Sequence, residues 1–139
     1  MRKEENFRKY VEKHFRIELP EGIAIFYTKG IRVGNNVIKK SGINGELGYA
    51  AADFGFNPTN SFIQNFGHLA KKNIVRLKKE EAVAFAAGKD IPMDLGIRAK
   101  HVIVTYRGHV LGLGHYDKKR IINRIPEKRR RIIVNPDGL

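Results

Sequence analysis

The chain has 139 residues, of which 42% are hydrophobic, enough to bury the core of one domain or of two very small domains that share it. Because the sequence contains no cysteine, disulfide bonds, thiolate zinc sites and a cysteine nucleophile are excluded. No apolar run is long enough for a transmembrane helix, and the net charge of +13 predicts a polyanionic partner.

The N-terminal segment predicts an amphipathic helix that ends near residue 20. Phe7, Tyr10, Val11, His14 and Phe15 have the spacing of one helical face. This aromatic face can dock on a core or stack on bases, and we favour docking. The first residues lack the apolar region of a secretory signal, so we expect a cytoplasmic protein.

Residues 23–40 are predicted to form short strands. Two β-favouring runs, 23–28 and 31–33, are followed by a reversal at residues 34–36 and a third run at 37–40. The cations that project from these strands are Arg32, Lys39 and Lys40. They are candidate contacts for a polyanion, with an ordinary solvated strand face as the alternative.

Residues 41–57 are glycine-rich, and we predict irregular structure with a buried middle. The pair Gly45-x-x-Gly48 is no phosphate loop, because the Lys-Ser/Thr step is missing. A helix is predicted from Asn57 or Thr59, the two cap candidates, to about Lys72. Its first turn could also bind an anion, and we favour a simple cap.

The second half begins with a strand candidate at residues 73–77. Residues 78–88 predict the clearest helix of the chain, with acids in the first turn, alanines in the body and a glycine at the end. A loop at residues 90–96 then leads to a β-hairpin at 101–116. Its turn is Arg107-Gly108, since glycine accepts the positive φ that a two-residue hairpin turn requires.

A dense basic cluster follows the hairpin. Residues 118–131 contain eight basic residues and a single acid, Glu127. They lie in and around two predicted strands, 120–125 and 131–134, and the connection between them. Such a field attracts a polyanion because each neutralised phosphate releases counterions, whereas a solvated basic tail is the alternative.

The predicted order is helix, strands, helix, strand, helix, hairpin, strand, strand. Because βαβ alternation is missing, this order predicts a mixed α+β domain whose short strands close a small barrel. We divide the chain into residues 1–72, an N-terminal helix with a small αβ subdomain, and residues 73–139, a domain with basic C-terminal strands.

Three motifs of the second half carry a resemblance to a known family. They are Ala84-Phe-Ala-Ala-Gly-Lys-Asp-Ile91, His101-Val-Ile-Val-Thr-Tyr-Arg-Gly-His-Val-Leu-Gly-Leu-Gly-His115 and Ile121-Ile-Asn-Arg-Ile-Pro-Glu-Lys-Arg-Arg130. Together they resemble the PUA-like RNA-binding module at the C-terminus of Sun/RsmF-type RNA cytosine-C5 methyltransferases. Upstream, Gly30-Ile-Arg-Val-Gly34 and Phe56-Asn-Pro-Thr59 are similar to the segment that precedes this module.

The resemblance implies an α+β fold, a PUA-like mixed β pseudobarrel with flanking helices and a small N-terminal α/β extension. It also implies that a helix, an adjoining loop and the late strands grip structured RNA. Two departures stand out: the catalytic domain and its cysteine nucleophile are missing from this sequence, and Ile125 stands where the family has an aromatic residue. We therefore expect a stand-alone, non-catalytic RNA-binding protein that needs no cofactor.

The expected RNA contacts are of two kinds. Basic side chains would contact phosphates, and Asn123, Tyr116 and His115 would contact sugar or base, with packing as an equal alternative for the last two. The full set is Arg32, Lys39, Lys40, Arg107, His115, Tyr116, Lys118, Lys119, Arg120, Asn123, Arg124, Lys128, Arg129, Arg130 and Arg131.

We expect a monomer that binds rRNA or tRNA in RNA modification or ribosome biogenesis, with an RNA-modifying enzyme in trans as a candidate partner and no membrane partner. A non-catalytic adaptor for another protein or an anionic membrane surface is the first alternative. The second is an enzyme that uses some of the five histidines together with Asp53, Asp94 or Asp117. No histidine pair has metal-ligand spacing, so we expect neither catalytic nor metal-binding residues.

Overall fold

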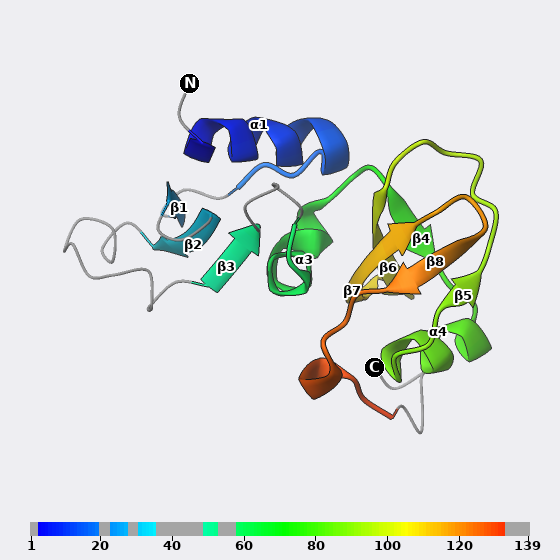
Figure 1. Cartoon of the computed structure of the whole chain (residues 1–139). Helices are drawn as coiled ribbons and strands as arrows, with labels where there is room; N and C mark the ends of the chain where they lie inside the picture. The colour runs from blue at the N-terminus through cyan, green and yellow to red at the C-terminus, as the bar shows by residue number, and fades with distance from the viewer. Residues whose placement is uncertain (1–2, 20–22, 28–30, 36–48, 53–57, 133–139) are drawn as a thin grey trace. The chain divides into compact units, whose positions relative to one another are not determined.

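The computed structural model describes residues 3–19, 23–27, 31–35, 49–52 and 58–132, with the side chains of 5–19 and 58–132. The chain forms two compact units, Met1–Lys72 and Asn73–Leu139, whose helices and strands are labelled in Figure 1. Within the described residues, no helix has both the length and the apolar character needed to cross a membrane.

The first unit opens with helix α1 (Lys3–Phe15), which buries one aromatic-rich face. Phe7, Val11 and Phe15, spaced four residues apart, are fully buried. The ring of Phe7 packs edge to face against Phe62, with 5.2 Å between ring centroids. Partial burial raises the pKa of Tyr10 to about 12, because the charged phenolate is poorly solvated. The predicted docking of this helix on a core is confirmed.

A three-stranded antiparallel sheet accompanies α1, in the order β1-β2-β3. Its strands are β1 (Ile23–Tyr27), β2 (Ile31–Asn35) and β3 (Tyr49–Ala52). Gly34 lies within β2 and pairs with Ala24 of β1. The reversal predicted at residues 34–36 therefore does not begin at Gly34. The third predicted run, 37–40, lies outside the described residues, and β3 is a strand in a stretch predicted to be irregular.

Helix α3 (Asn60–Phe66) starts at one of the two predicted caps. The hydroxyl of Thr59 accepts the N–H of Phe62 at 3.2 Å, which satisfies one of the unpaired donors of the first turn. A 3-10 turn, η2 (Gly67–Leu69), ends the helical segment a little before the predicted residue 72.

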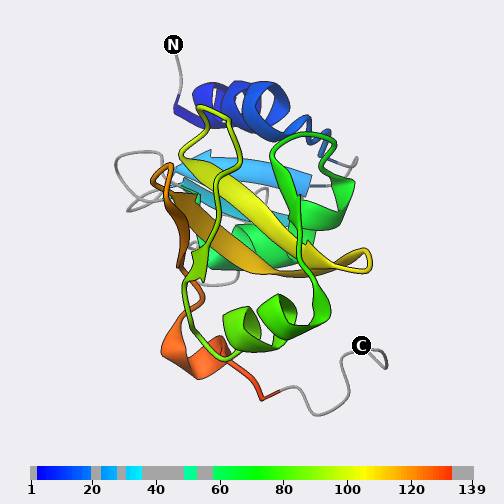
Figure 2. The same cartoon turned by 90° about the vertical axis from the view of Figure 1, so that its right-hand side faces the viewer.

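The second unit is built on a five-stranded mixed sheet in the order β4-β6-β7-β8-β5. Its strands are β4 (Ile74–Arg76), β5 (Ile91–Pro92), β6 (His101–Tyr106), β7 (His109–Tyr116) and β8 (Arg120–Asn123). β4 is parallel to β6 and the other pairs are antiparallel. The sheet is curled, and helix α4 (Lys79–Ala86) lies along it (Figure 2). The predicted α+β class is confirmed.

Strands β6 and β7 form the predicted hairpin. Arg107 and Gly108 have φ angles of 48° and 82°, so both residues of the turn are left-handed, as a type I′ hairpin turn requires. The register shifts between Val104 and Thr105, which leaves Leu111 as an extra residue on β7. A bulge of this kind increases the local twist and contributes to the curl of the sheet.

Helix α4 closes the core of the second unit. Phe85 is fully buried in one cluster with Val102 and Val104 of β6. At the start of α4, the carboxylate of Glu81 accepts the N–H of Lys78 at 2.9 Å. At its end, Gly88 has a left-handed φ of 105°, so the predicted glycine stop is confirmed.

The C-terminal segment differs from the prediction. β8 ends at Asn123, and a 3-10 turn, η3 (Glu127–Arg129), replaces part of the predicted strand connection. Residues 131 and 132 are not in a strand, because the N–H of Arg131 donates to the carbonyl of Ala86 in α4 instead of a neighbouring strand. Residues 133–134 of the predicted strand lie outside the described residues.

Gly114 in β7 is a point of close packing. A Cβ atom there would collide with Cγ2 of Ile121 and would lie 3.1 and 3.2 Å from the Cγ2 atoms of Val104 and Val102. We predict that Gly114→Ala lowers the free energy of unfolding by about 1–3 kcal/mol, measured by urea denaturation. Gly108→Asn is the control, since space around Gly108 is open and asparagine tolerates a left-handed φ. An unchanged stability of Gly114→Ala would contradict the close packing.

Candidate nucleic-acid interface

The turn between β7 and β8 presents two exposed lysines, Lys118 and Lys119. Oδ1 of Asp117 accepts the backbone N–H groups of Lys119 at 3.0 Å and of Arg120 at 2.9 Å. Both bonds stabilise the charged carboxylate and therefore hold the pKa of Asp117 below its usual range. The bond from Lys119 has the larger effect, and the bond from Arg120 comes next. The turn is therefore fixed by its own carboxylate, with Lys118 in a left-handed conformation at φ 78°.

Arg120 is already engaged inside the protein. Its guanidinium lies 3.5 Å from Oδ2 of Asp90 and 3.5 Å from Oδ2 of Asp117. The pairs are exposed and add little stability, but two carboxylates balance the charge of Arg120. Lys118 and Lys119 make no ion pair with a described residue, so they contribute more of the positive field at this turn.

Tyr116 is a core residue. Its side chain is 4% exposed, and its hydroxyl accepts the N–H of Leu95 at 2.7 Å and lies 3.3 Å from Oδ1 of Asp94. This burial of ring and hydroxyl favours the packing alternative for Tyr116. His115 is half-buried, and its ring lies edge-on to that of His101 with 5.7 Å between centroids.

The C-terminal end of α4 is tied to distant parts of the chain. Its last four carbonyls, at residues 83–86, all accept backbone N–H groups. Residues 87–89 supply the donors for the first three, and the N–H of Arg131 reaches the carbonyl of Ala86 at 2.9 Å. The carbonyl of Phe85 accepts a second bond, from the side-chain amide of Asn123, at 2.7 Å. No carbonyl of this turn is left unpaired.

Asn123 is the residue that joins β8 to this helix end. Its amide nitrogen donates to the carbonyls of Phe85 at 2.7 Å and Lys89 at 3.1 Å, and its Oδ1 accepts the N–H of Ile125 at 2.9 Å. Its own backbone N–H donates to Oδ1 of Asp90 at 2.8 Å. Because its amide donors and its acceptor oxygen are engaged, a structural role for Asn123 is favoured over the predicted contact to sugar or base.

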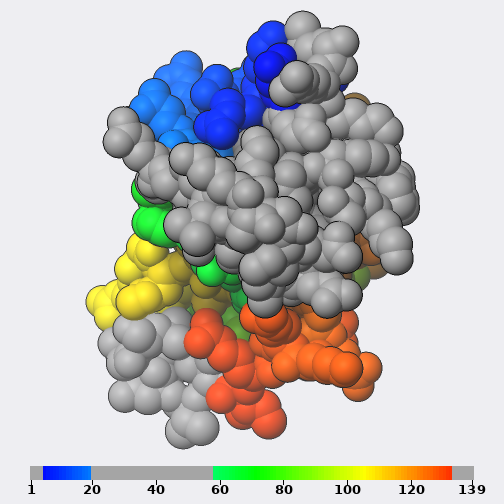
Figure 3. Space-filling model, turned by 90° about the vertical axis from the view of Figure 1, so that its left-hand side faces the viewer, coloured from blue at the N-terminus to red at the C-terminus, as the bar shows by residue number. Residues whose placement is uncertain are grey.

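Residues 127–131 form a segment that we call the basic strap. It starts after the buried Ile125 and returns to α4 through the bond between Arg131 and Ala86. Lys128, Arg129 and Arg131 are exposed and make no ion pair with any described residue. The strap runs near α4 in Figures 1 and 2, and its red end lies at the surface in Figure 3.

Besides Arg130, which is also exposed, the strap and the end of α4 bring five exposed cations to one region, which we call the strap face. These are Lys89, Arg124, Lys128, Arg129 and Arg131. The sequence prediction missed Lys89, although its position directly after the Gly88 helix stop marks it as a loop cation. The bond from Asn123 to its carbonyl places this loop beside β8. The strap contains one acid, Glu127, so the strap face is strongly positive.

Arg107 is a predicted contact that does not join the strap face. Val102 of β6 is level with Asn123 of β8, because Gly114 of β7 pairs with both residues. Arg107, at the hairpin tip, is five residues beyond Val102. Arg107 and Asn123 are therefore about 17 Å apart along the strand direction. Arg32 belongs to β2 in the other compact unit, where it pairs with Phe26 and its side chain is not described. Lys39 and Lys40 lie outside the described residues.

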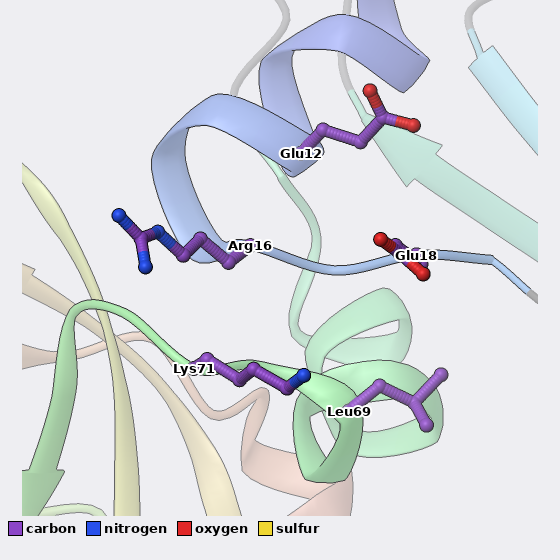
Figure 4. A pocket seen from close by; sticks show the side chains of 5 residues that line it. All are labelled: Glu12, Arg16, Glu18, Leu69 and Lys71. Carbon is purple, nitrogen blue, oxygen red and sulfur yellow. The ribbon is translucent and has the colours of Figure 1, made fainter.

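The enzyme alternative requires a metal-binding group or a pocket with reactive side chains. No group of three His, Asp or Glu residues there could hold a metal ion. A surface pocket of about 550 Å³ in the first unit is lined by Glu12, Arg16, Glu18, Leu69 and Lys71 (Figure 4). Two of its charged side chains are acidic and two are basic, and all four are exposed. The lining of this pocket therefore contains no buried charged group.

Comparison with known proteins identifies the second unit. The family model described as the PUA domain of methyltransferase RsmF matches residues 72–131. These residues form a PUA domain of the RsmF type. The match extends from the start of β4 to the end of the basic strap, and it supports an RNA-binding role for the PUA domain.

Curated relatives agree with this assignment. Ribosomal RNA small subunit methyltransferase F of Psychromonas ingrahamii is 36% identical over 75 residues, which are 53% of this chain and 16% of that enzyme. The enzymes of the same name from Aeromonas hydrophila and Aeromonas salmonicida are 31% and 28% identical over 74 residues, again 53% of this chain and 16% of each relative. The matched part therefore spans about one sixth of these relatives.

The role of Asn123 can be tested by stability. We predict that Asn123→Ala lowers the free energy of unfolding by about 1–3 kcal/mol, because it leaves the N–H of Ile125 unpaired and removes two bonds to carbonyls. Arg124→Ala, an exposed neighbour, should change the free energy by less than about 0.5 kcal/mol. If the amide of Ile125 exchanges faster in Asn123→Ala and not in Arg124→Ala, the lost bond between the Ile125 N–H and Oδ1 of Asn123 is a cause of the lower stability.

The β7–β8 turn should respond to acid. Since the pKa of Asp117 is lower in the folded chain than its ordinary value of 3.8, the charged carboxylate stabilises the turn above pH 3.8. This stabilisation is lost as the pH falls through the lower native value. An NMR titration should find the Asp117 carboxyl midpoint below 3.8, and a midpoint at or above 3.8 would contradict the two backbone bonds.

Proposed function

We propose that this chain binds structured rRNA or tRNA through the strap face of its PUA domain and serves RNA modification or ribosome biogenesis. The observation that carries the proposal is the gathering of five exposed cations at the end of α4 by backbone and side-chain bonds. The curated relatives are named as methyltransferases of small-subunit ribosomal RNA, which favours rRNA as the substrate class.

The fixed placement of these cations favours a nucleic acid over an anionic membrane. A polybasic segment is attracted to lipid headgroups without any defined geometry. Here the strap is bonded to α4 through Arg131, and the neighbouring loop is bonded to β8 through Asn123. Because the backbone that carries these cations is already held in place, less ordering is needed when they contact the phosphates of a folded RNA, which lowers the entropic cost of binding.

The contacts that we propose are mainly to phosphates. Tyr116 is buried and Asn123 is engaged in the fold, which favours structural roles for these two residues, and the half-buried His115 remains a candidate contact to sugar or base. Lys118 and Lys119 at the β7–β8 turn extend the positive surface. Arg107 and the N-terminal cations Arg32, Lys39 and Lys40 remain candidate contacts.

The wider role follows the same proposal. The PUA domain in residues 73–139 supplies the RNA grip, residues 1–72 form an accessory αβ subdomain, and the chain acts as a non-catalytic monomer in the cytoplasm. An RNA-modifying enzyme in trans would then carry out the chemistry. The match to relatives covers their PUA region alone, so catalysis by this chain has no support from the comparison.

Salt-dependent binding tests the proposal. We predict that Lys128→Ala/Arg129→Ala weakens binding to a folded rRNA or tRNA fragment. Because each phosphate contact contributes about 0.7–0.9 to the slope of log K against log salt, the loss of two contacts should make this slope shallower by about 1.4–1.8. The control Lys13→Ala/Lys71→Ala removes the same charge from exposed positions of the other unit and should leave the slope almost unchanged. Fluorescence anisotropy across a salt series measures the affinity and the salt slope of each variant.

The same experiment includes duplex DNA of equal length and vesicles rich in anionic lipid. A clear preference for the folded RNA supports the proposal. Equal binding to all three polyanions, or an equal effect of the strap and control variants, would mean that the basic residues act as general charge. Tighter binding to vesicles than to RNA would favour the membrane adaptor.

A further inference from the structure

We infer that Arg130 is a positioning residue that holds the basic strap on α4, with Gly88 providing the space for its side chain. Arg130 belongs to the cluster expected to contact phosphates, but its surroundings distinguish it from Lys128 and Arg129. The inference concerns how the strap is held; its consequence for RNA affinity rests on the proposed function.

The side chain of Arg130, an exposed residue, passes close to Gly88 in the loop that ends α4. Its Nε donates to the carbonyl of Ile125 at 3.2 Å. A Cβ atom added to Gly88 would lie 2.5 Å from both Cδ and Nε of Arg130 and 2.9 Å from Cζ. Real Cβ atoms do not approach heavy atoms this closely, so the side chain occupies the space that any residue other than glycine would fill.

Gly88 therefore meets two requirements at once. Its left-handed φ of 105° ends the helix, and its missing Cβ admits the Arg130 side chain. The first requirement is common at helix ends, whereas the second depends on a residue that is 42 positions later in the chain. Gly96 offers a comparison, since it has a left-handed φ of 64° and open space around it.

The bonds on both sides of Arg130 show what its side chain holds in place. Its backbone N–H donates to the carbonyl of Glu127 at 3.3 Å and closes η3, and the N–H of Arg131 donates to Ala86 at 2.9 Å. Lys128 and Arg129 lie between the buried Ile125 and this double attachment. Arg130 thus fixes the turn that displays the two exposed cations.

Arginine suits this position for chemical reasons. Its planar guanidinium group can lie flat on a glycine backbone while Nε, which lysine lacks, donates to a carbonyl. A cation near the C-terminal end of α4 is also favourable, because the carbonyls there carry partial negative charge. Lysine would keep the charge and lose the Nε bond.

Hydrogen exchange of the full chain, measured by NMR, tests the inference without any RNA. We expect the amide of Arg131 to exchange about tenfold faster in Arg130→Ala, Arg130→Lys and Gly88→Ala, because each variant releases the strap. Arg129→Ala removes a neighbouring exposed cation, and Gly96→Ala adds left-handed strain without the Arg130 contact. Both controls should leave Arg131 exchange within about twofold of the native rate.

The double variant Gly88→Ala/Arg130→Ala separates this contact from general damage to the helix end. If Gly88 acts through Arg130, the double variant should exchange no faster at Arg131 than either single variant. Additive effects would show that the two residues act independently and would overturn the inference. Native exchange of Arg131 in Arg130→Ala would overturn it as well.

RNA binding then connects the strap to the proposed function. Gly88→Ala removes no charge, and it should nevertheless weaken binding to the rRNA or tRNA fragment by about tenfold, because the strap cations must be ordered on binding. Faster Arg131 exchange with unchanged RNA affinity would support the positioning role and contradict the proposed RNA site. A third outcome is that Arg131 exchanges at the native rate in Arg130→Ala while the salt slope falls by the amount of one phosphate contact. That result would identify Arg130 as a direct RNA contact, and the proposed function would still hold.

Discussion

The pairing of the carbonyls at the end of α4 is the constraint on which the PUA domain depends. A helix leaves its last carbonyls without partners inside the helix, and burying them unpaired is costly. The next residues along the chain satisfy most of them, but Asn123 and Arg131 supply further donors from more than thirty positions away. These two bonds connect the helix, the last strand of the sheet and the basic strap into one unit.

The same arrangement explains how so many cations can gather. Like charges repel, and the strap face contains five exposed cations in one region. The partial negative charge of the helix C-terminus offsets part of this repulsion, and Arg130 lies against that end of the helix. At the neighbouring turn, Asp90 and Asp117 balance Arg120. All eight basic residues of the cluster are exposed, and the side chains of two of them, Arg120 and Arg130, are also engaged in bonds within the fold.

Signals that act over a few residues made much of the fold predictable. The Thr59 cap, the Gly88 stop and the Arg107-Gly108 turn each follow from the conformational preference of one or two residues. Contacts between distant segments were not predictable in this way. The Ile-Ile-Val pattern after Arg131 suggests a strand, yet the Arg131 N–H pairs with a helix carbonyl. The side chain of Asn123 can read a base or cap a helix, and sequence alone does not decide which.

The internal use of Asn123 and Tyr116 also limits how the proposed interface can recognise RNA. Base edges are read by hydrogen bonds and stacking, but the amide of Asn123 is engaged, and the side chains of Tyr116 and Ile125 are buried. The strap face offers lysine and arginine side chains, which contact phosphates whatever the sequence. We infer that selectivity at this face comes from the spacing of phosphates, which the three-dimensional shape of the RNA sets. A rigid strap is then a requirement for selectivity, because cations on a mobile segment would fit any arrangement of phosphates.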